Sequence, residues 1–196
     1  MSEHQDLIKC DCTTCKLRAS GIAVPPGHLD PIERKFVDDI AEFGCHITAV
    51  HGEGDIDNGF AYSTGLFSNY GHPEIIVFGQ NQVWQQSVIN AALGDIKQGK
   101  SFRDGEICDD FIPPFKITFR AVPTQTYPSY MGWSIWYYDT FHPDNAAFEA
   151  TQLVWPDKQH RFPWDLEYDG NPYKQPVLAA YDWILDGDDF VPVVKR

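Results

Sequence analysis

The sequence predicts a single α+β domain, in which a mainly antiparallel or mixed β-sheet carries two or more amphipathic helices. Three observations predict this fold class. The chain of 196 residues is long enough to bury one sizeable core. Two segments repeat apolar residues at helical spacing, and several short runs of β-branched and aromatic residues lie between turn formers. Because no internal repeat or heptad pattern is present, one sheet with helices packed on it is the simplest architecture.

The first predicted element is a helix that begins after Asp30. Asp30 is a good N-cap, Pro31 suits the first helical position, Glu33 stands at the third, and Gly44 is placed to end the helix. Apolar residues recur at spacings of three and four and form one stripe. These are Ile32, Phe36, Val37, Ile40 and Phe43.

Short runs that favour strands follow this helix, and a second helix comes after them. The predicted strands are Cys45–Val50, Phe60–Thr64 and Glu74–Phe78. Asn81 caps the second helix, which ends near Gly99. Its apolar face, expected to lie on the sheet, holds Val83, Trp84, Val88, Ile89, Ala92, Leu93 and Ile96.

The second half of the chain is less regular. Alternating or apolar runs predict strands at Lys116–Val122 and Thr151–Trp155, with a further one at Val177–Ala180. The stretch Tyr127–Phe141 is so aromatic that its pattern fits either a strand or a buried helix.

Charge and composition restrict the function. The formal net charge is −13, which repels phosphate backbones and argues against nucleic-acid binding. The same charge attracts a basic protein partner, although it also serves solubility. The chain has no run of about 18 apolar residues and no secretory signal at its start, so we expect a cytoplasmic location without membrane contact.

Three of the five cysteines lie in residues 1–29, a predicted irregular arm that precedes the α+β domain at residues 30–196. A tetrahedral zinc site needs four ligands, so the three thiols need one more. Reduced thiols without metal and a redox role are the alternatives. The thiols are Cys10, Cys12 and Cys15, and the candidates for the fourth ligand are Cys45, His46 and His4.

A second group combines imidazoles with carboxylates. His46 and His51 are an odd number of residues apart, so on a strand they lie on opposite faces and do not share a site. Glu53, Asp55 and Asp57 follow and resemble a solvated turn.

The His72-Pro73-Glu74 turn is the densest polar signal. We expect Tyr62, Thr64, His72 and Glu74 to meet at one sheet edge or in nearby turns. In the catalytic hypothesis, His72 is the acid or base and Glu74 orients it. Tyr62 is a further candidate catalytic residue. The alternative is a turn made rigid by proline, with a purely structural role.

The loop from Trp155 to Trp164 combines two Trp, two Pro and an Arg. Such a loop suits a stacking pocket for a flat ligand, an anchor in a protein interface, a lid or core packing. Its candidate binding residues are Trp155, Asp157, Arg161 and Trp164, and we add Thr64 from the preceding group.

Six blocks of the sequence are Gly44–Val50, Phe60–Leu66, His72–Gly79, Trp155–Asp157, Phe162–Asp165 and Gln175–Leu178. Together these blocks resemble a bacterial family known as domain of unknown function 4262. The resemblance covers the chain from about Asp30 to Ala180. It implies a bacterial or phage cytosolic protein and implies no catalytic residue, and the spacing of the three N-terminal cysteines departs from the family.

Two functions of different classes remain. The first is an acidic protein-binding module of the immunity or inhibitor type, because negative charge and an aromatic loop suit a basic partner. The alternative is a small-molecule-binding protein or enzyme with a pocket between the His72-Pro73-Glu74 turn and the Trp155–Trp164 loop. No Gly-rich phosphate loop, nucleophile elbow or dinucleotide fingerprint is present.

Overall fold

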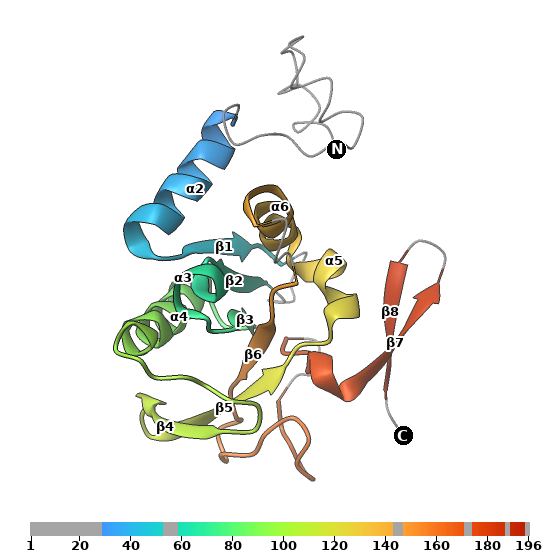
Figure 1. Ribbon diagram of the computed structural model, residues 1–196. Helices are drawn as coiled ribbons and strands as arrows, with labels where there is room; N and C mark the ends of the chain where they lie inside the picture. Colours follow the sequence, from blue (N-terminus) through green and yellow to red (C-terminus); the bar gives the residue numbers. More distant parts are fainter. Residues whose placement is uncertain (1–28, 53–58, 143–146, 171–173, 187–188, 195–196) are drawn as a thin grey trace.

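A six-stranded mixed sheet forms the centre of the protein (Figure 1). The computed structural model describes residues 29–52, 59–142, 147–170, 174–186 and 189–194. The strands lie in the order β1-β2-β3-β6-β5-β4, and the pair β3–β6 is parallel while the other neighbours are antiparallel. Their bounds are β1 His46–Val50, β2 Phe60–Thr64, β3 Glu74–Phe78, β4 Ile107–Ile112, β5 Phe115–Ala121 and β6 Ala150–Val154.

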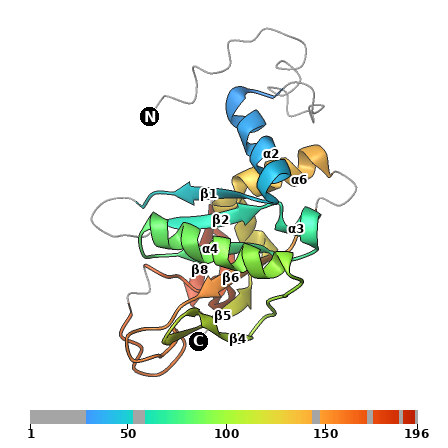
Figure 2. The ribbon, with the colours of Figure 1, turned by 90° about the vertical axis from the view of Figure 1, so that its left-hand side faces the viewer.

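Helices cover both faces of this sheet, which confirms the predicted α+β class. Helix α4 (Gln82–Lys97) lies on one face, and α5 (Tyr127–Tyr130) and α6 (Gly132–Phe141) lie on the other (Figures 1 and 2). Helix α2 (Pro31–Phe43) contacts β1, and the short α3 (Leu66–Tyr70) precedes β3. A 3-10 turn at Thr124–Thr126, η1, leads into α5.

The ends of α2 and α4 follow the capping signals in the sequence. The Asp30 carboxylate accepts hydrogen bonds from the backbone N–H groups of Ile32 and Glu33, and Gly44 ends α2 with a φ of 88°. Asn81 accepts a hydrogen bond from the backbone N–H of Trp84 at the start of α4. These caps satisfy backbone groups that a helix end otherwise leaves unpaired.

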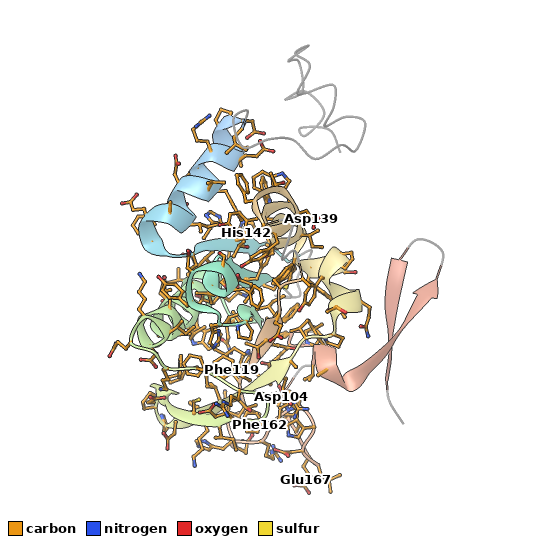
Figure 3. All side chains as sticks on the ribbon, viewed as in Figure 1. Asp104, Phe119, Asp139, His142, Phe162 and Glu167 are labelled. Atoms are coloured by element: carbon orange, nitrogen blue, oxygen red, sulfur yellow. The ribbon has the colours of Figure 1, made fainter. Side chains whose placement is uncertain are left out.

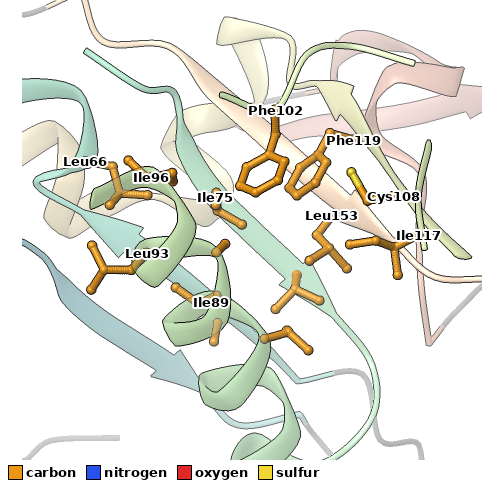
Figure 4. Close-up of a cluster of buried hydrophobic side chains, with 14 of the residues drawn as sticks. Leu66, Ile75, Ile89, Leu93, Ile96, Phe102, Cys108, Ile117, Phe119 and Leu153 are labelled. Carbon is orange, nitrogen blue, oxygen red and sulfur yellow. The ribbon is translucent and has the colours of Figure 1, made fainter. Parts of the chain in front are cut away.

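Alternation along the strands divides the core into two layers. Ile75 and Val77 of β3 face α4 and belong to the cluster in Figure 4. Ile76 and Phe78 face the opposite way and pack with Tyr138 of α6. Because side chains of β3 are buried on both faces, this strand forms the centre of the fold.

Two segments differ from the sequence-based prediction or decide between its alternatives. The strand predicted at Val177–Ala180 is wrong, because residues Leu178–Ala180 form a 3-10 turn, η3. The buried Gln152 side chain donates to the carbonyl of Pro176 and accepts from the N–H of Leu178, so these two backbone groups are paired without a neighbouring strand. The aromatic stretch Tyr127–Phe141 is helical.

Four further elements of the structure are not among the predicted ones. Strand β4 is exposed at several positions and carries two carboxylates, so it lacks a regular apolar alternation. Helix α3 has five residues, too few for a helical period. Strands β7 (Tyr181–Asp186) and β8 (Asp189–Val194) pair with each other in a separate two-stranded sheet.

Candidate functional site

The parallel pair β3–β6 sorts the candidate residues to its two ends. Glu74 is paired with Ala150 at the start of both strands, and Val77 with Leu153 near their carboxyl ends. The His72-Pro73-Glu74 turn therefore lies at one end of the pair, while Trp155 follows β6 at the other. The expectation of a single pocket between these two blocks is corrected by this arrangement, because two parallel strands separate them.

Glu74 is fully buried and holds the start of α3. Its carboxylate accepts hydrogen bonds from Ser63 Oγ at 2.6 Å, from the N–H of Gly65 at 2.8 Å and from the N–H of Phe67 at 3.1 Å. The Tyr138 hydroxyl donates a fourth. Burial raises the pKa of Glu74, although all four donors favour its charged form.

His72 is also buried, and the backbone uses both of its ring nitrogens. Nδ1 lies 2.7 Å from the carbonyl oxygen of Pro73, and Nε2 accepts the N–H of Phe102 at 3.1 Å. These partners define a neutral ring with the proton on Nδ1, and burial lowers the pKa of His72. Neither nitrogen bonds to Glu74, which is the partner that a catalytic pair requires.

Tyr62 and Thr64 lie on the α6 side of β2. Thr64 Oγ1 is 2.7 Å from Ser134 Oγ and is fully buried, so it offers no surface to a ligand or partner. The Tyr62 hydroxyl accepts the N–H of Trp133, and burial raises its pKa. The structure thus brings these residues near one end of the sheet but seals them inside it.

A hollow of about 460 Å³ lies beside this end of the strands. Its lining includes Pro73, Phe102, Tyr127 and Thr151, and it does not include His72 or Glu74. The candidate acid and base are therefore separated from the space in which a substrate would bind.

A second hollow, of about 500 Å³, lies at the opposite end, where β3 and β6 finish. Trp84 of α4, Trp155 and Phe115 form much of its wall, which also contains Ile112 at the end of β4. Carboxyl ends of parallel strands are a common place for ligands in α/β sheets. The lining residues are Gln80, Trp84, Ile112, Phe115, Trp155, Pro156, Asp157, Lys158, Gln159, Asp169 and Gly170. We call this site the aromatic hollow.

Trp155 is a rigid wall of the aromatic hollow. Its ring Nε1 donates to the carbonyl of Phe78 at 2.9 Å, and its backbone N–H and carbonyl both bond to the Gln175 side chain. The ring packs edge to face with Trp84, with centroids 6.3 Å apart. Gly79 permits this approach, since a Cβ there would lie 3.0 Å from the Trp155 ring and 2.8 Å from the Lys174 carbonyl oxygen.

Asp157 organises the loop that borders the aromatic hollow. Oδ1 accepts the N–H groups of Gln159 and Arg161, at 2.8 and 2.9 Å. Oδ2 accepts Arg161 Nε at 2.8 Å and the N–H of Asp169 at 3.0 Å. Desolvation raises the pKa of Asp157, but these hydrogen bonds outweigh it and lower that pKa to about 2.

Backbone strain gathers around the same hollow. Among the described residues, the non-glycine residues with left-handed φ angles are Gln80, His160 and Glu167. Gln80 lines the hollow, the His160 ring stacks on Phe115 at 4.8 Å, and Glu167 lies in the loop closed by Asp157. Such conformations cost free energy and tend to persist where a site needs a particular shape.

The two other candidates from this loop lie outside the lining. Arg161 pairs with Asp157 and so supports the loop. Trp164 stacks on Phe162 at 5.1 Å, and the Arg120 guanidinium lies 5.3 Å from its ring centroid. Figure 3 labels Phe162 and Glu167 on this loop, far from Asp139 and His142 at the α6 end.

Of the proposed zinc ligands, Cys45 and His46 lie in the described part of the chain. Cys10, Cys12, Cys15 and His4 lie outside the described residues, as do Glu53, Asp55 and Asp57. Cys45 is buried in the α4 layer, and burial raises its pKa to about 12. His46 faces α2, where Nδ1 lies 2.9 Å from Asp39 Oδ2, whereas His51 bonds to Gln82 of α4. Within the described part of the chain, no cluster of three or more His, Cys, Asp or Glu side chains suits a metal ion.

Fold and site together define an α+β protein with a mixed sheet and an aromatic hollow at the carboxyl end of its parallel strands. No helix in the described ranges combines the length and apolar character that a membrane span needs. The family model described as "Domain of unknown function (DUF4262)" matches residues 39–169, so the chain belongs to this family, as the resemblance predicted. No curated protein and no solved structure matches the chain.

Proposed function

We propose that this protein binds a small organic molecule with a planar, apolar body in the aromatic hollow. The observation that carries the proposal is the hollow itself, whose volume of about 500 Å³ is enclosed in part by Trp84, Trp155 and Phe115. Ligand sites in proteins have such volumes and are mostly lined by apolar and aromatic side chains.

The geometry of the walls favours a flat ligand. The Trp84 and Trp155 rings meet at 76°, so a planar molecule can stack on one ring and present its edge to the other. The wall around Trp155 is fixed by three hydrogen bonds to Phe78 and Gln175. A wall that is already ordered loses little conformational entropy when a ligand binds.

A titration with indole tests this function. Indole is planar and uncharged, and we expect saturable binding by isothermal titration calorimetry at pH 7. Trp84→Ala removes one wall and should weaken binding by at least about fivefold, since a stacked ring contributes about 1–3 kcal/mol. Trp164→Ala is the matched control, because Trp164 is not among the lining residues. Equal binding by the Trp84→Ala variant would remove the aromatic hollow as the site.

A second candidate function is recognition of a basic protein, and the exposed loop beyond Asp157 favours it. Leu166 is 91% exposed and Trp164 is 45% exposed, and they alternate with Asp165 and Glu167. Apolar anchors with flanking carboxylates suit a basic partner, as does the formal net charge of −13. An immunity or inhibitor role is the form of this function that the charge favours.

The partner hypothesis is tested with the double variant Trp164→Ala/Leu166→Ser. A basic protein that co-purifies with the wild type should be lost from the double variant and retained by Ile32→Ser, which changes an exposed apolar residue on α2 instead. Equal recovery with all three proteins would mean that the loop is not the contact surface.

We also propose a cytoplasmic location. Both cysteines whose positions are described, Cys45 and Cys108, are free thiols, as is usual in a reducing compartment.

A further inference from the structure

Two opposite charges lie on the wall of the aromatic hollow. Lys158 and Asp169 both line it, and both side chains are exposed. Among the described residues, neither the Lys158 ammonium nor the Asp169 carboxylate has an ion-pair partner within 4.0 Å. Within the described part of the chain, the lining of the hollow thus offers an unpaired cation and an unpaired anion beside its aromatic walls.

The same carboxylate positions both charged residues. Asp157 precedes Lys158 in the chain, and its Oδ2 accepts the backbone N–H of Asp169 at 3.0 Å. Its Oδ1 meanwhile holds the N–H groups of Gln159 and Arg161. The two ends of the loop are therefore tied to one carboxylate, which orders the backbone next to both lining residues before any ligand arrives.

We propose that the ligand of the aromatic hollow is a free aromatic α-amino acid, with its carboxylate at Lys158 and its ammonium at Asp169. The inference rests on the proposed function and specifies its ligand class. The planar side chain would lie against Trp84 and Trp155, where the apolar wall is.

The pairing of charges narrows the ligand chemistry. A free α-amino acid carries an ammonium and a carboxylate on the same carbon, so it satisfies both Lys158 and Asp169. A peptide offers only one of the two charges at each end of its chain. A neutral aromatic molecule leaves both protein charges without a partner, although it loses little because both are solvated.

Four probes that share the indole ring but carry different charges distinguish these ligand classes. Indole has no charge, tryptophan amide keeps only the ammonium, N-acetyltryptophan keeps only the carboxylate, and L-tryptophan has both. Dissociation constants are measured by NMR titration at pH 7 and low salt. An exposed charge pair gains up to about 1 kcal/mol, or about fivefold in affinity. With two such pairs, we therefore expect L-tryptophan to bind up to about 25-fold more tightly than indole, with the two singly charged probes between them.

Variants that remove one charge of the protein test which charge of the ligand each residue contacts. Lys158→Met should abolish the advantage of L-tryptophan over tryptophan amide, and Asp169→Asn its advantage over N-acetyltryptophan. Lys97→Met and Asp139→Asn change the net charge equally, but they lie at the far end of α4 and on α6. These controls should leave the order of the four probes unchanged.

The outcomes distinguish the inference from the function on which it rests. If indole binds and L-tryptophan gains no affinity over it, the amino-acid inference is overturned and the small-molecule site stands. If N-acetyltryptophan or tryptophan amide binds as tightly as L-tryptophan, the ligand is a singly charged acid or amine and the inference is again overturned. If no probe binds, including indole, the proposed function itself fails.

Discussion

Two carboxylates at opposite ends of the β3–β6 pair show how differently one kind of side chain can be used. Glu74 and Asp157 each accept four hydrogen bonds from the protein. Glu74 is 0% exposed and its pKa is raised, whereas Asp157 is 7% exposed and has a pKa lowered to about 2. Glu74 is buried more deeply and has only neutral donors, whereas one donor to Asp157 is the Arg161 guanidinium, so burial and the charge of the donor together set the direction.

The difference also separates the two ends by role. At the Glu74 end, the polar groups form hydrogen bonds with one another inside the fold and support the start of α3. At the Asp157 end, one carboxylate holds a loop in place while neighbouring side chains remain free to contact a ligand. A rigid support beside unpaired groups is the arrangement expected of a binding site.

The largest expected effect comes from Glu74→Ala. This change leaves Ser63 Oγ and the N–H groups of Gly65 and Phe67 without their acceptor in a buried place. Each buried donor without a partner costs about 1–3 kcal/mol, so the loss should exceed about 3 kcal/mol in urea unfolding. Glu74→Gln keeps the volume and one acceptor oxygen, and should cost less. A loss below about 1 kcal/mol for Glu74→Ala would contradict the role given to this network.

Asp157→Ala should have a smaller effect on stability and a larger one on binding. The loop between Asp157 and Asp169 would lose the ties to Gln159, Arg161 and Asp169, so trypsin should cleave after Lys158 or Arg161 sooner than in the wild type. Indole affinity should fall as well, because Asp157 shapes the wall. Unchanged proteolysis would show that other contacts order the loop.

The stabilities contributed by Asp157 and by Glu74 should change with pH in opposite directions. The lowered pKa of Asp157 means that its stabilisation is present above its unfolded pKa of about 3.9 and is lost as the pH falls through about 2. The gap in Tm between the wild type and Asp157→Asn should therefore narrow between about pH 4 and pH 2.

For Glu74 the pH dependence of the stability has the opposite sign. Its raised pKa means that burial favours the neutral form, so its contribution is present at low pH and is lost as the pH rises through the folded pKa. The wild type should lose stability relative to Glu74→Gln as the pH rises above about 4.3. Parallel slopes for the two variants would show that desolvation does not separate the two carboxylates.

The smallest expected effect is that of Trp164→Ala. Trp164 is about half exposed, and its contacts with Phe162 and Arg120 lie at the surface. A cation–π contact at such a site contributes about 0.5–1 kcal/mol. Chemical denaturation should show a loss of about 1 kcal/mol or less, with unchanged indole affinity. A loss as large as that of Glu74→Ala would mean that this loop belongs to the core.

Local signals in the sequence were enough for the first part of the fold. The N-cap residues Asp30 and Asn81 and the left-handed Gly44 mark helix ends through short-range hydrogen bonds, so the pattern predicts them. Strand β3 has the predicted bounds because Glu74–Phe78 is a compact run after a proline.

The site depends on long-range pairing, which no local pattern contains. The parallel contact of β3 with β6 places the His72 turn and Trp155 at opposite ends, so the single pocket expected from the sequence does not form. The sequence pattern also does not predict which amide side chains are buried. Gln85, Gln152 and Gln175 read as polar positions, yet each is buried and bonds to backbone groups that a strand or loop would leave unpaired. Trp155 and Asp157 were predicted binding residues and do line the hollow, whereas Lys158 and Asp169 gave no signal beyond their charge.

The most direct test of the proposed binding site is the set of Trp side-chain N–H signals in a ¹H–¹⁵N NMR spectrum, assigned by single Trp→Phe variants and followed during an indole titration. The chain has six Trp. If the aromatic hollow is the site, the signals of Trp84 and Trp155 shift and saturate together, while those of Trp133, Trp136 and Trp164 stay in place. If Trp84 and Trp155 do not move, or if all these signals drift without saturation, the hollow does not bind planar molecules and the account is wrong.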